Sequence, residues 1–572
     1  MNAYYFFTAK AARCFWLLLA ILGLAIPRPA LAVGSWKPLA NFPAEGVGHM
    51  HLMSDGTVMA QGGGGAGTNW FRLTPDTNGS YLTGQWSSMT PMHDTRRYYS
   101  SDVLQDGRVF VAGGEYGTGY DKAEVYDPIA TNWTPIPING LVSTATNLGA
   151  QGEHFNGFAD SLSVLLSTGQ VLITPVTPVP LGETVLFDPQ SNTLLEGAIL
   201  PFGDSSADEQ SAVKLPDDSI LTFDSDFDGE RYIPSQGQWI EDQNLPTQLF
   251  SSSGEVGAGF LLPDGRAFFL GGTGLTIYYT PSGNTNLGGW KPGPNIPGGL
   301  MAQDTPAAMM NNGKILCAFA IGSNHHTNYF YEFDSATGTF TQTSGPNSPT
   351  TDTNYVLSDA TSMLDLPDGT VLYSDTGGQL YDYKPDAAPL ASGMPVITSI
   401  AYNTDGSLHI SGLIFNGISQ GASFGDDNQM DSNYPLVRFT DGSGHVTYGR
   451  TYNWSSTSVQ TGSKIVTTEC AVPANIFNSQ GVYSMQVVAN GNASSPVTFY
   501  GPVWVDFNYT GSTTDGGFAT PVKTLAAGTN AVFNGGTIAI NASVQPSSSH
   551  ETMKIAKPMT IISVYGSSTI GN

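Results

Sequence analysis

The sequence predicts an all-β protein built around a seven-bladed β-propeller. Seven times along the chain, an apolar run reaches a tight polar turn and a second apolar run follows. The turns are Asp55-Gly56, Asp106-Gly107, Thr168-Gly169, Asp217-Asp218, Asp264-Gly265, Asn312-Gly313 and Asp368-Gly369, spaced 47 to 62 residues apart. Asp-Gly and Asn-Gly favour the positive φ that a two-residue hairpin turn requires. A period of about 50 residues, with strands on both sides of each turn, is typical of propeller blades.

Each repeat contains four candidate strands, which is the content of one blade. The second strand often ends in paired glycines, such as Gly113-Gly114, which let backbones approach closely near the crowded axis. A tryptophan often closes the unit, as at Trp133, Trp239 and Trp290. We expect these aromatic residues to pack between neighbouring blades.

The two ends of the repeat array predict how the ring closes. The seventh unit stops near Pro385 without a closing tryptophan, whereas residues 35–39 form an orphan strand that contains Trp36. We expect this strand to pair with the seventh blade, because closure removes exposed sheet edges. The third and fourth units are degenerate, so six or eight blades are the alternatives.

The pattern changes beyond the repeats. Alternating strands from 395 to 506 predict one immunoglobulin-like β-sandwich. The tail has a candidate helix at 521–532 and short strands at 535–540, 551–555 and 559–564, and it resembles the first coils of a parallel β-helix. The predicted organisation is a signal peptide (1–32), a propeller (33–394), a sandwich (395–506) and a β-rich tail (507–572).

The first 32 residues have the pattern of a secretory signal peptide. Lys10 and Arg13 precede a short apolar stretch, and Ala30-Leu31-Ala32 is a small-residue cleavage site. An uncleaved anchor is the alternative, but the stretch is short for a bilayer, and no later segment is long and apolar enough. The sequence therefore predicts a secreted or cell-surface protein without an integral membrane segment after cleavage.

The charge of the chain limits the classes of partner, and its cysteines predict the state of its thiols. The mature chain would carry 18 basic against 47 acidic residues, which disfavours nucleic acid and anionic membranes as partners. This excess of acid is compatible with cation binding. Cys317 and Cys470 remain after cleavage, and we expect two buried free thiols, with one disulfide as the alternative.

The repeats resemble kelch repeats, and the whole arrangement resembles the galactose oxidase and glyoxal oxidase group. The best local match is Arg96-Arg97-Tyr98-Tyr99-Ser100-Ser101 with the following Asp106-Gly107-Arg108 turn. In these oxidases this place holds a copper-ligand tyrosine cross-linked to a cysteine, and Tyr98 corresponds to that tyrosine. The resemblance therefore implies a copper cofactor and oxidation of primary alcohols or aldehydes.

The remaining copper ligands of the family match less well. The place of the cysteine falls near His49, with no cysteine nearby. The axial Tyr-His pair falls on Asp359-Ala360, and the resemblance implies His445 as the histidine ligand from the sandwich. The resemblance thus supports the fold more strongly than the oxidase chemistry.

Two further groups are candidate metal ligands. His49 and His51 alternate on one inner strand, so both imidazoles could bind one transition metal. The alternative is two polar residues at a solvated channel mouth. Asp224, Asp226 and Asp228 precede a glycine and could supply several oxygens to calcium. The alternative there is an acidic hairpin turn.

Four consecutive residues are candidates for ligand binding. Arg96 and Arg97 could clamp a carboxylate or an acidic sugar, or could pair with an aspartate of a neighbouring blade. Tyr98 and Tyr99 offer aromatic faces that stack on sugars, although tyrosines also pack between blades.

These patterns lead to three hypotheses. The first is an exported, non-catalytic binding or cell-surface scaffold, with carbohydrate as its ligand. The second is a divergent copper-radical oxidase that keeps Tyr98 and His445 and uses His49 as a substitute ligand. The third is a calcium-stabilised adhesin that uses the 224–230 loop. Copper content separates the first two hypotheses, and calcium-dependent melting tests the third.

Overall fold

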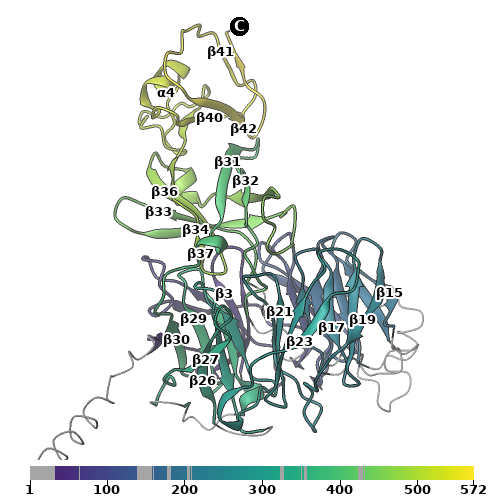
Figure 1. The fold of residues 1–572 in the computed structure, drawn as a ribbon. Helices are drawn as coiled ribbons and strands as arrows, with labels where there is room; N and C mark the ends of the chain where they lie inside the picture. Colours follow the sequence, from purple (N-terminus) through teal and green to yellow (C-terminus); the bar gives the residue numbers. More distant parts are fainter. Residues whose placement is uncertain are drawn as a thin grey trace, which may run out of the picture. The chain divides into compact units, whose positions relative to one another are not determined.

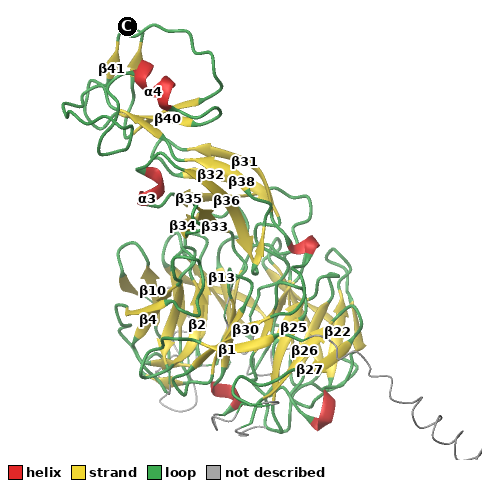
Figure 2. Ribbon diagram, turned by 90° about the vertical axis from the view of Figure 1, so that its left-hand side faces the viewer, coloured by secondary structure: helices red, strands yellow, loops and turns green. Residues whose placement is uncertain are grey.

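Seven four-stranded antiparallel sheets confirm the predicted propeller (Figures 1 and 2). The computed structural model describes residues 33–571, except 64, 138–156, 159, 177–181, 202–206, 208, 323–326, 349–350, 353–356, 423–429 and 431. The predicted signal peptide, 1–32, lies outside the described residues. Among the described residues, no helix has both the length and the apolar character needed to cross a membrane.

The first four blades follow one another along the chain. They are β2 (Val47–Leu52), β3 (Val58–Gly62), β4 (Trp70–Thr74) and β5 (Gln85–Ser88); β7 (Ser100–Val103), β8 (Val109–Ala112), β10 (Ala123–Asp127) and β11 (Asn132–Ile136); β12 (Leu162–Leu165), β13 (Val171–Thr174), β14 (Glu183–Asp188) and β15 (Thr193–Ile199); and β16 (Val213–Lys214), β17 (Ile220–Phe223), β18 (Asp228–Ile233) and β19 (Gln238–Asn244).

The last three blades complete the ring. They are β20 (Gly259–Leu261), β21 (Ala267–Leu270), β22 (Thr276–Thr280) and β23 (Gly289–Pro292); β24 (Ala307–Met309), β25 (Ile315–Phe319), β26 (Tyr329–Asp334) and β27 (Thr339–Gln342); and β28 (Ser362–Asp365), β29 (Val371–Ser374) and β30 (Leu380–Lys384) with β1 (Ser35–Pro38).

All seven predicted turns join the first and second strands of a blade and have a positive φ at their second position, between 71° and 88°. The side chain of the first turn residue usually caps the turn. Asp55 Oδ1, for example, accepts a hydrogen bond from the Thr57 amide at 3.0 Å. The local turn chemistry therefore fixes where each hairpin lies along the chain.

The N-terminal strand closes the ring as predicted. β1 pairs antiparallel with β30, which places Trp36 opposite Tyr383. The Trp36 ring lies 5.0 Å from the ring of Phe330 in the sixth blade and 4.7 Å from that of Tyr383. Aromatic packing between blades recurs elsewhere, with Phe268 stacked on Phe333 at 4.3 Å. The blade count is therefore seven, and the alternatives of six and eight are wrong.

A second β region follows the propeller. It contains β31 (Val396–Tyr402), β32 (Leu408–Leu413), β33 (Leu436–Thr440), β34 (Val446–Tyr452), β35 (Val466–Ala471), helix α3 (Ala474–Phe477), β36 (Val482–Ala489), β37 (Asn492–Ala493) and β38 (Val497–Tyr500). β34 pairs with both β33 and β35, so all eight strands join in one half-barrel sheet. Its relationship to immunoglobulin-like sandwiches stays a prediction.

The half-barrel is hydrogen-bonded to the propeller near the hairpin turns. The Thr451 amide donates to the Ser54 carbonyl at 3.1 Å, and Gln460 Nε2 donates to the Leu262 carbonyl at 2.6 Å. Because each innermost strand runs toward its turn, the loops that precede these strands lie at the opposite end of the propeller.

The tail contains parallel strands, as the resemblance to a β-helix implies. β39 (Val503–Val505), β40 (Thr537–Asn541) and β42 (Thr560–Val564) form one parallel sheet, and β41 (Ser548–Ser549) pairs in parallel with β43 (Thr569–Ile570). The predicted strand at 551–555 is wrong. Glu551 instead accepts hydrogen bonds from the first amides of helix α4 (Leu525–Ala531), at 2.7 and 3.0 Å, since a helix N-terminus exposes unpaired donors.

Candidate functional site at the propeller mouth

A cavity of about 190 Å³ lies at the end of the propeller opposite the hairpin turns. It is lined by Tyr98, Glu115, Tyr116, Asp160, Glu209, Glu255, Gln303, Asp304, Ser358 and Asp359. These residues come from the loops of six of the seven blades. Only the axis is close to so many blades at once, so the cavity marks the mouth of the propeller.

Four of the lining residues have a left-handed backbone. Tyr98, Asp160, Glu209 and Asp304 have φ of 53°, 45°, 57° and 49°, and each lies two to four residues before the innermost strand of its blade. Residues other than glycine adopt this conformation at an energetic cost, and such positions cluster at functional sites. The same conformation thus recurs at the mouth in the loops of four blades.

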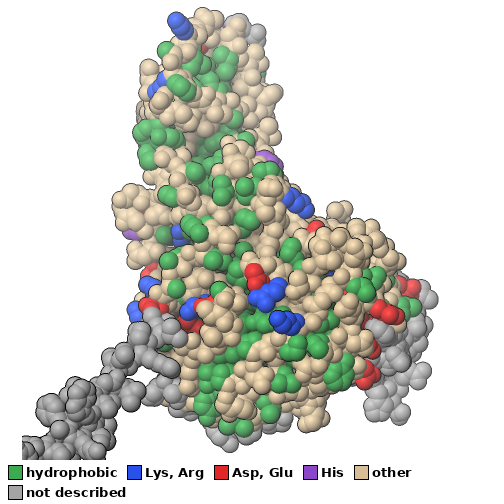
Figure 3. Space-filling model, viewed as in Figure 1, with side chains coloured by type: hydrophobic (Ala, Val, Ile, Leu, Met, Phe, Trp, Pro, Cys, Tyr) green, Lys and Arg blue, Asp and Glu red, His purple; other side chains and the backbone are tan. Residues whose placement is uncertain are grey.

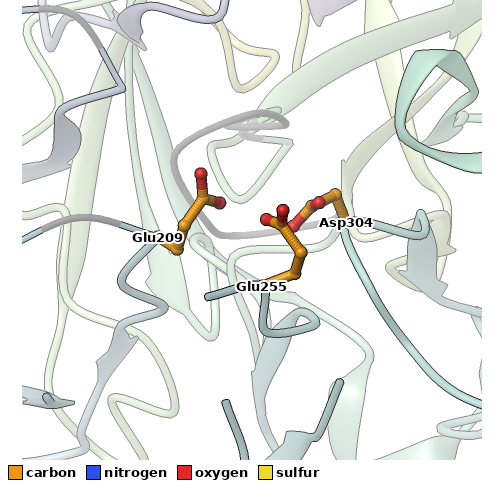
Figure 4. A group of neighbouring side chains, drawn as sticks. All are labelled: Glu209, Glu255 and Asp304. Atoms are coloured by element: carbon orange, nitrogen blue, oxygen red, sulfur yellow. The ribbon is translucent and has the colours of Figure 1, made fainter. Parts of the chain in front are cut away.

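The cavity is strongly acidic. Six partly buried carboxylates line it: Glu115, Asp160, Glu209, Glu255, Asp304 and Asp359. The carboxylate oxygens of three of them, Glu209, Glu255 and Asp304, lie within 4.8 Å of one another (Figure 4). At an effective dielectric constant of about 20, two charges at that distance repel by about 3.5 kcal/mol. The site therefore favours ligands that donate hydrogen bonds or carry positive charge.

Two tyrosines form the rim of this cavity. Tyr98 Oη donates a hydrogen bond to Asp359 Oδ2 at 3.0 Å, and the Arg97 guanidinium lies 4.3 Å from the centre of the Tyr98 ring. The Tyr116 ring meets the Tyr98 ring edge-on at 6.1 Å and is 51% exposed. The neighbouring Glu115 carboxylate raises the pKa of Tyr116, so its phenol stays a hydrogen-bond donor. The rim thus combines an exposed aromatic face with polar tips.

Two predicted ligand-binding residues belong instead to the protein interior. The Arg96 guanidinium is fully buried and donates to Glu124 Oε1 at 3.1 Å and to the carbonyls of Gly113 and Lys122 at 2.5 and 2.8 Å. Tyr99 is 1% exposed and donates to Gln61 Oε1 at 2.8 Å. The prediction that these two side chains contact a ligand is therefore wrong.

The predicted histidine ligands lie away from the mouth. His49 and His51 come together on β2, with their Nε2 atoms 3.2 Å apart and Ser101 Oγ 2.6 Å from His49 Nε2. Burial lowers the pKa of His49 to about 3, so this imidazole is neutral at physiological pH. His445 is exposed on the turn between β33 and β34, 3.1 Å from Asp441 Oδ2. None of the three lines the cavity.

The predicted calcium loop forms the turn between β17 and β18. Asp224 Oδ1 accepts hydrogen bonds from the amides of Asp226 and Asp228, at 3.0 and 2.9 Å. Burial, followed by the charges of Asp224 and Asp226, raises the pKa of Asp228. This geometry is that of the acidic hairpin turn. Within the described ranges, the carboxylates that converge within 4.8 Å are those of the mouth and not these three.

The mouth carboxylates were missed in the sequence analysis because they form no local motif. Glu209, Glu255 and Asp304 are separated by 46 and 49 residues, close to the blade period. The sequence feature that these residues share is their distance from the hairpin turn of each blade. Glu209, Glu255 and Asp304 each lie nine or ten residues before the second residue of the hairpin turn in the same blade. Tyr98 and Asp359 have the same spacing from the hairpin turns of their blades. Superposing the seven repeats would have identified the ring of acids.

Comparison with known proteins agrees with the observed architecture. The Kelch motif family matches residues 96–139. Galactose oxidase of Gibberella zeae is 27% identical over 221 residues, which cover 33% of this chain and 29% of the oxidase. The chain is a galactose oxidase-like kelch propeller.

Two further proteins are similar to this chain over a short segment or at low identity. An F-box/kelch-repeat protein of Arabidopsis thaliana is 33% identical over 79 residues, or 13% of this chain and 22% of that protein. The chain thus spans less than a third of the length of these curated relatives. A fungal alcohol oxidase solved in complex with copper has a TM-score of 0.48 and 16% identity, covering 82% of this chain and all of that one.

The residues at the mouth do not fit a copper-radical centre. The positions that the family resemblance assigns to a tyrosine and a histidine hold Asp359, which accepts the Tyr98 hydrogen bond, and Ala360. The two cysteines of the described chain, Cys317 and Cys470, are buried free thiols in β25 and β35. Copper favours imidazole and sulfur donors, whereas an array of carboxylates favours hard cations such as calcium. The lining of the mouth therefore suits a hard cation better than copper.

Proposed function

We propose that this protein is an extracellular binding protein that holds carbohydrate at the propeller mouth without catalysing a reaction. The observation that supports this most is the lining of the mouth cavity, where six carboxylates and two tyrosines converge from six blades. Carboxylate oxygens accept hydrogen bonds from sugar hydroxyls. The exposed Tyr116 ring offers a face on which a sugar ring stacks.

The size of the cavity supports a small ligand. Its volume of about 190 Å³ is below the range of about 300–1,000 Å³ that is usual for drug-sized ligands. A single sugar residue, or the end of a longer glycan, suits this volume better than an extended chain. Nucleic acid is a poor alternative, because the chain carries a net charge of -26 and the mouth itself is acidic.

The N-terminal sequence supports a location outside the cell. Residues 1–32 have the pattern of a secretory signal peptide. The visible surface in Figure 3 has few charged side chains, in keeping with a content of 12% charged residues. A secreted or cell-surface scaffold for carbohydrate is the role that we infer from these features together.

Calorimetric titration of the full chain with a panel of mono- and oligosaccharides tests this function. We expect at least one sugar to bind, and Tyr116→Ala to weaken its binding about two- to tenfold, since an aromatic contact contributes about 0.5–1.5 kcal/mol. Tyr565→Ala is the matched control, because Tyr565 is 50% exposed but lies in the tail. A wild-type chain that binds none of the sugars would refute the proposal.

A divergent copper-radical oxidase is the second candidate. The observations that favour it are the position of Tyr98 in the mouth cavity and the similarity to galactose oxidase. Copper content and peroxide production on primary alcohols and aldehydes test it. One retained copper per chain, with turnover that is lost in Tyr98→Phe, would establish the oxidase and displace the binding function.

A further inference from the structure

Three mouth carboxylates are arranged as a group that could hold one cation. Glu209, Glu255 and Asp304 come from the loops before β16, β20 and β24, the innermost strands of three consecutive blades. Figure 4 shows their carboxyl groups directed toward one shared space. Their oxygens lie within 4.8 Å of one another. Since calcium–oxygen bonds are about 2.3–2.6 Å long, a single calcium ion can bridge oxygens at this separation.

A second observation at the same place concerns a buried amide oxygen. Gln303 lines the cavity beside Asp304 and is only 6% exposed. Its Oε1 atom is buried and accepts no hydrogen bond from any residue that the structure describes. A buried amide oxygen without a donor is destabilising and rare in folded proteins. A bound cation would satisfy this oxygen together with the three carboxylates.

We propose that Glu209, Glu255 and Asp304 bind a calcium ion at the propeller mouth, with the Gln303 amide as a neutral oxygen donor. Carboxylate and amide oxygens are the donors that calcium prefers, and this group contains no nitrogen or sulfur donor that would favour copper or zinc. The three side chains are partly exposed, so an ion has access to them from solvent.

The ion would also take part in carbohydrate binding, a step that rests on the proposed function. Calcium takes six to eight oxygen ligands, and the four side chains leave positions free. Neighbouring hydroxyl groups of a sugar can fill such positions. The mouth would therefore bind the sugar partly through the metal and partly through the Tyr116 rim.

Titration of the EDTA-treated full chain with Ca²⁺ alone tests the metal site. We expect one site per chain, weakened about tenfold or more in Glu255→Gln and in Asp304→Asn, because affinity depends on ligand charge. Asp226→Asn is the control, since it removes an exposed carboxylate from the other candidate calcium loop. A wild-type chain that binds no Ca²⁺, or an unchanged affinity in both mouth variants, would overturn the proposal.

Melting temperatures distinguish the loss of a calcium ligand from a general folding defect in these variants. In EDTA, Glu255→Gln should melt at or above the wild-type temperature, because it relieves repulsion among the carboxylates. In excess Ca²⁺ the order should reverse, since the wild type gains stability from the bound ion. A variant that melts below the wild type to the same degree in both conditions would contradict the proposal.

Sugar titrations in EDTA and in Ca²⁺ distinguish the proposed carbohydrate function from the proposed calcium site. Sugar binding that EDTA abolishes and Ca²⁺ restores is the expected result. Ca²⁺ binding without any sugar binding would refute the carbohydrate function and leave the metal site standing. Sugar binding with no bound Ca²⁺ would refute the metal site and leave the function standing.

Discussion

Two neighbouring arginines should differ sharply in what they contribute to stability. Arg96 forms a buried ion pair with Glu124, whose side chain is 1% exposed, and its two backbone contacts hold the loop after β8 against the loop before β10. Removing one partner of a buried pair leaves an uncompensated charge and costs about 3–5 kcal/mol. We therefore expect Arg96→Met to lower the free energy of unfolding by about 4 kcal/mol.

Urea unfolding followed by tryptophan fluorescence measures this loss. Arg97→Met is the matched control, and it should cost less than about 1 kcal/mol because its guanidinium is partly exposed over Tyr98. The double variant Arg96→Met/Glu124→Leu should recover part of the loss, since no buried charge is left unpaired. An Arg96→Met chain within about 1 kcal/mol of the wild type would refute the structural role of Arg96.

Three further predictions concern side chains that pack in the interior of the protein. Burial raises the pKa of Asp365 from 3.8 to about 6, so the folded state binds a proton more tightly than the unfolded state. The contribution of Asp365 to stability should therefore fall as the pH rises from about 4 to 6. Urea unfolding at a series of pH values measures this dependence, which Asp365→Asn should flatten. Trp36→Ala should cost about 3 kcal/mol in the same assay, because the ring-closing strand loses its aromatic contacts, and a loss below about 1 kcal/mol would contradict closure by this strand. Cys317 and Cys470 should react with a thiol reagent only after denaturation, because burial raises both thiol pKa values, and rapid labelling of the native chain would contradict this.

The fold could be predicted largely because its signals are local. Each Asp-Gly or related turn fixes a hairpin, and the orphan strand around Trp36 has a single vacant sheet edge to fill. The prediction failed where a polar residue served a tertiary role. Glu551 lies in a segment that alternates like a strand, but its carboxylate caps a helix 25 residues earlier in the chain.

The site was predictable only in part. Tyr98 was found through the family resemblance, whereas Glu209, Glu255 and Asp304 converge from loops about one blade period apart. Nothing local marks three such acids as neighbours. Arg96 could have been separated from Arg97 in advance, because adjacent residues on a strand point to opposite faces and only one of them can face the mouth.

The central claim is that the propeller mouth binds carbohydrate, and one titration tests it most directly. The sugar that binds best is titrated into the wild type, Tyr116→Ala and Tyr565→Ala, whose tyrosines are 51% and 50% exposed in the wild-type protein. The account predicts that Tyr116→Ala weakens binding about two- to tenfold and that Tyr565→Ala leaves it unchanged. Equal affinity in all three proteins would place the ligand elsewhere and contradict the account.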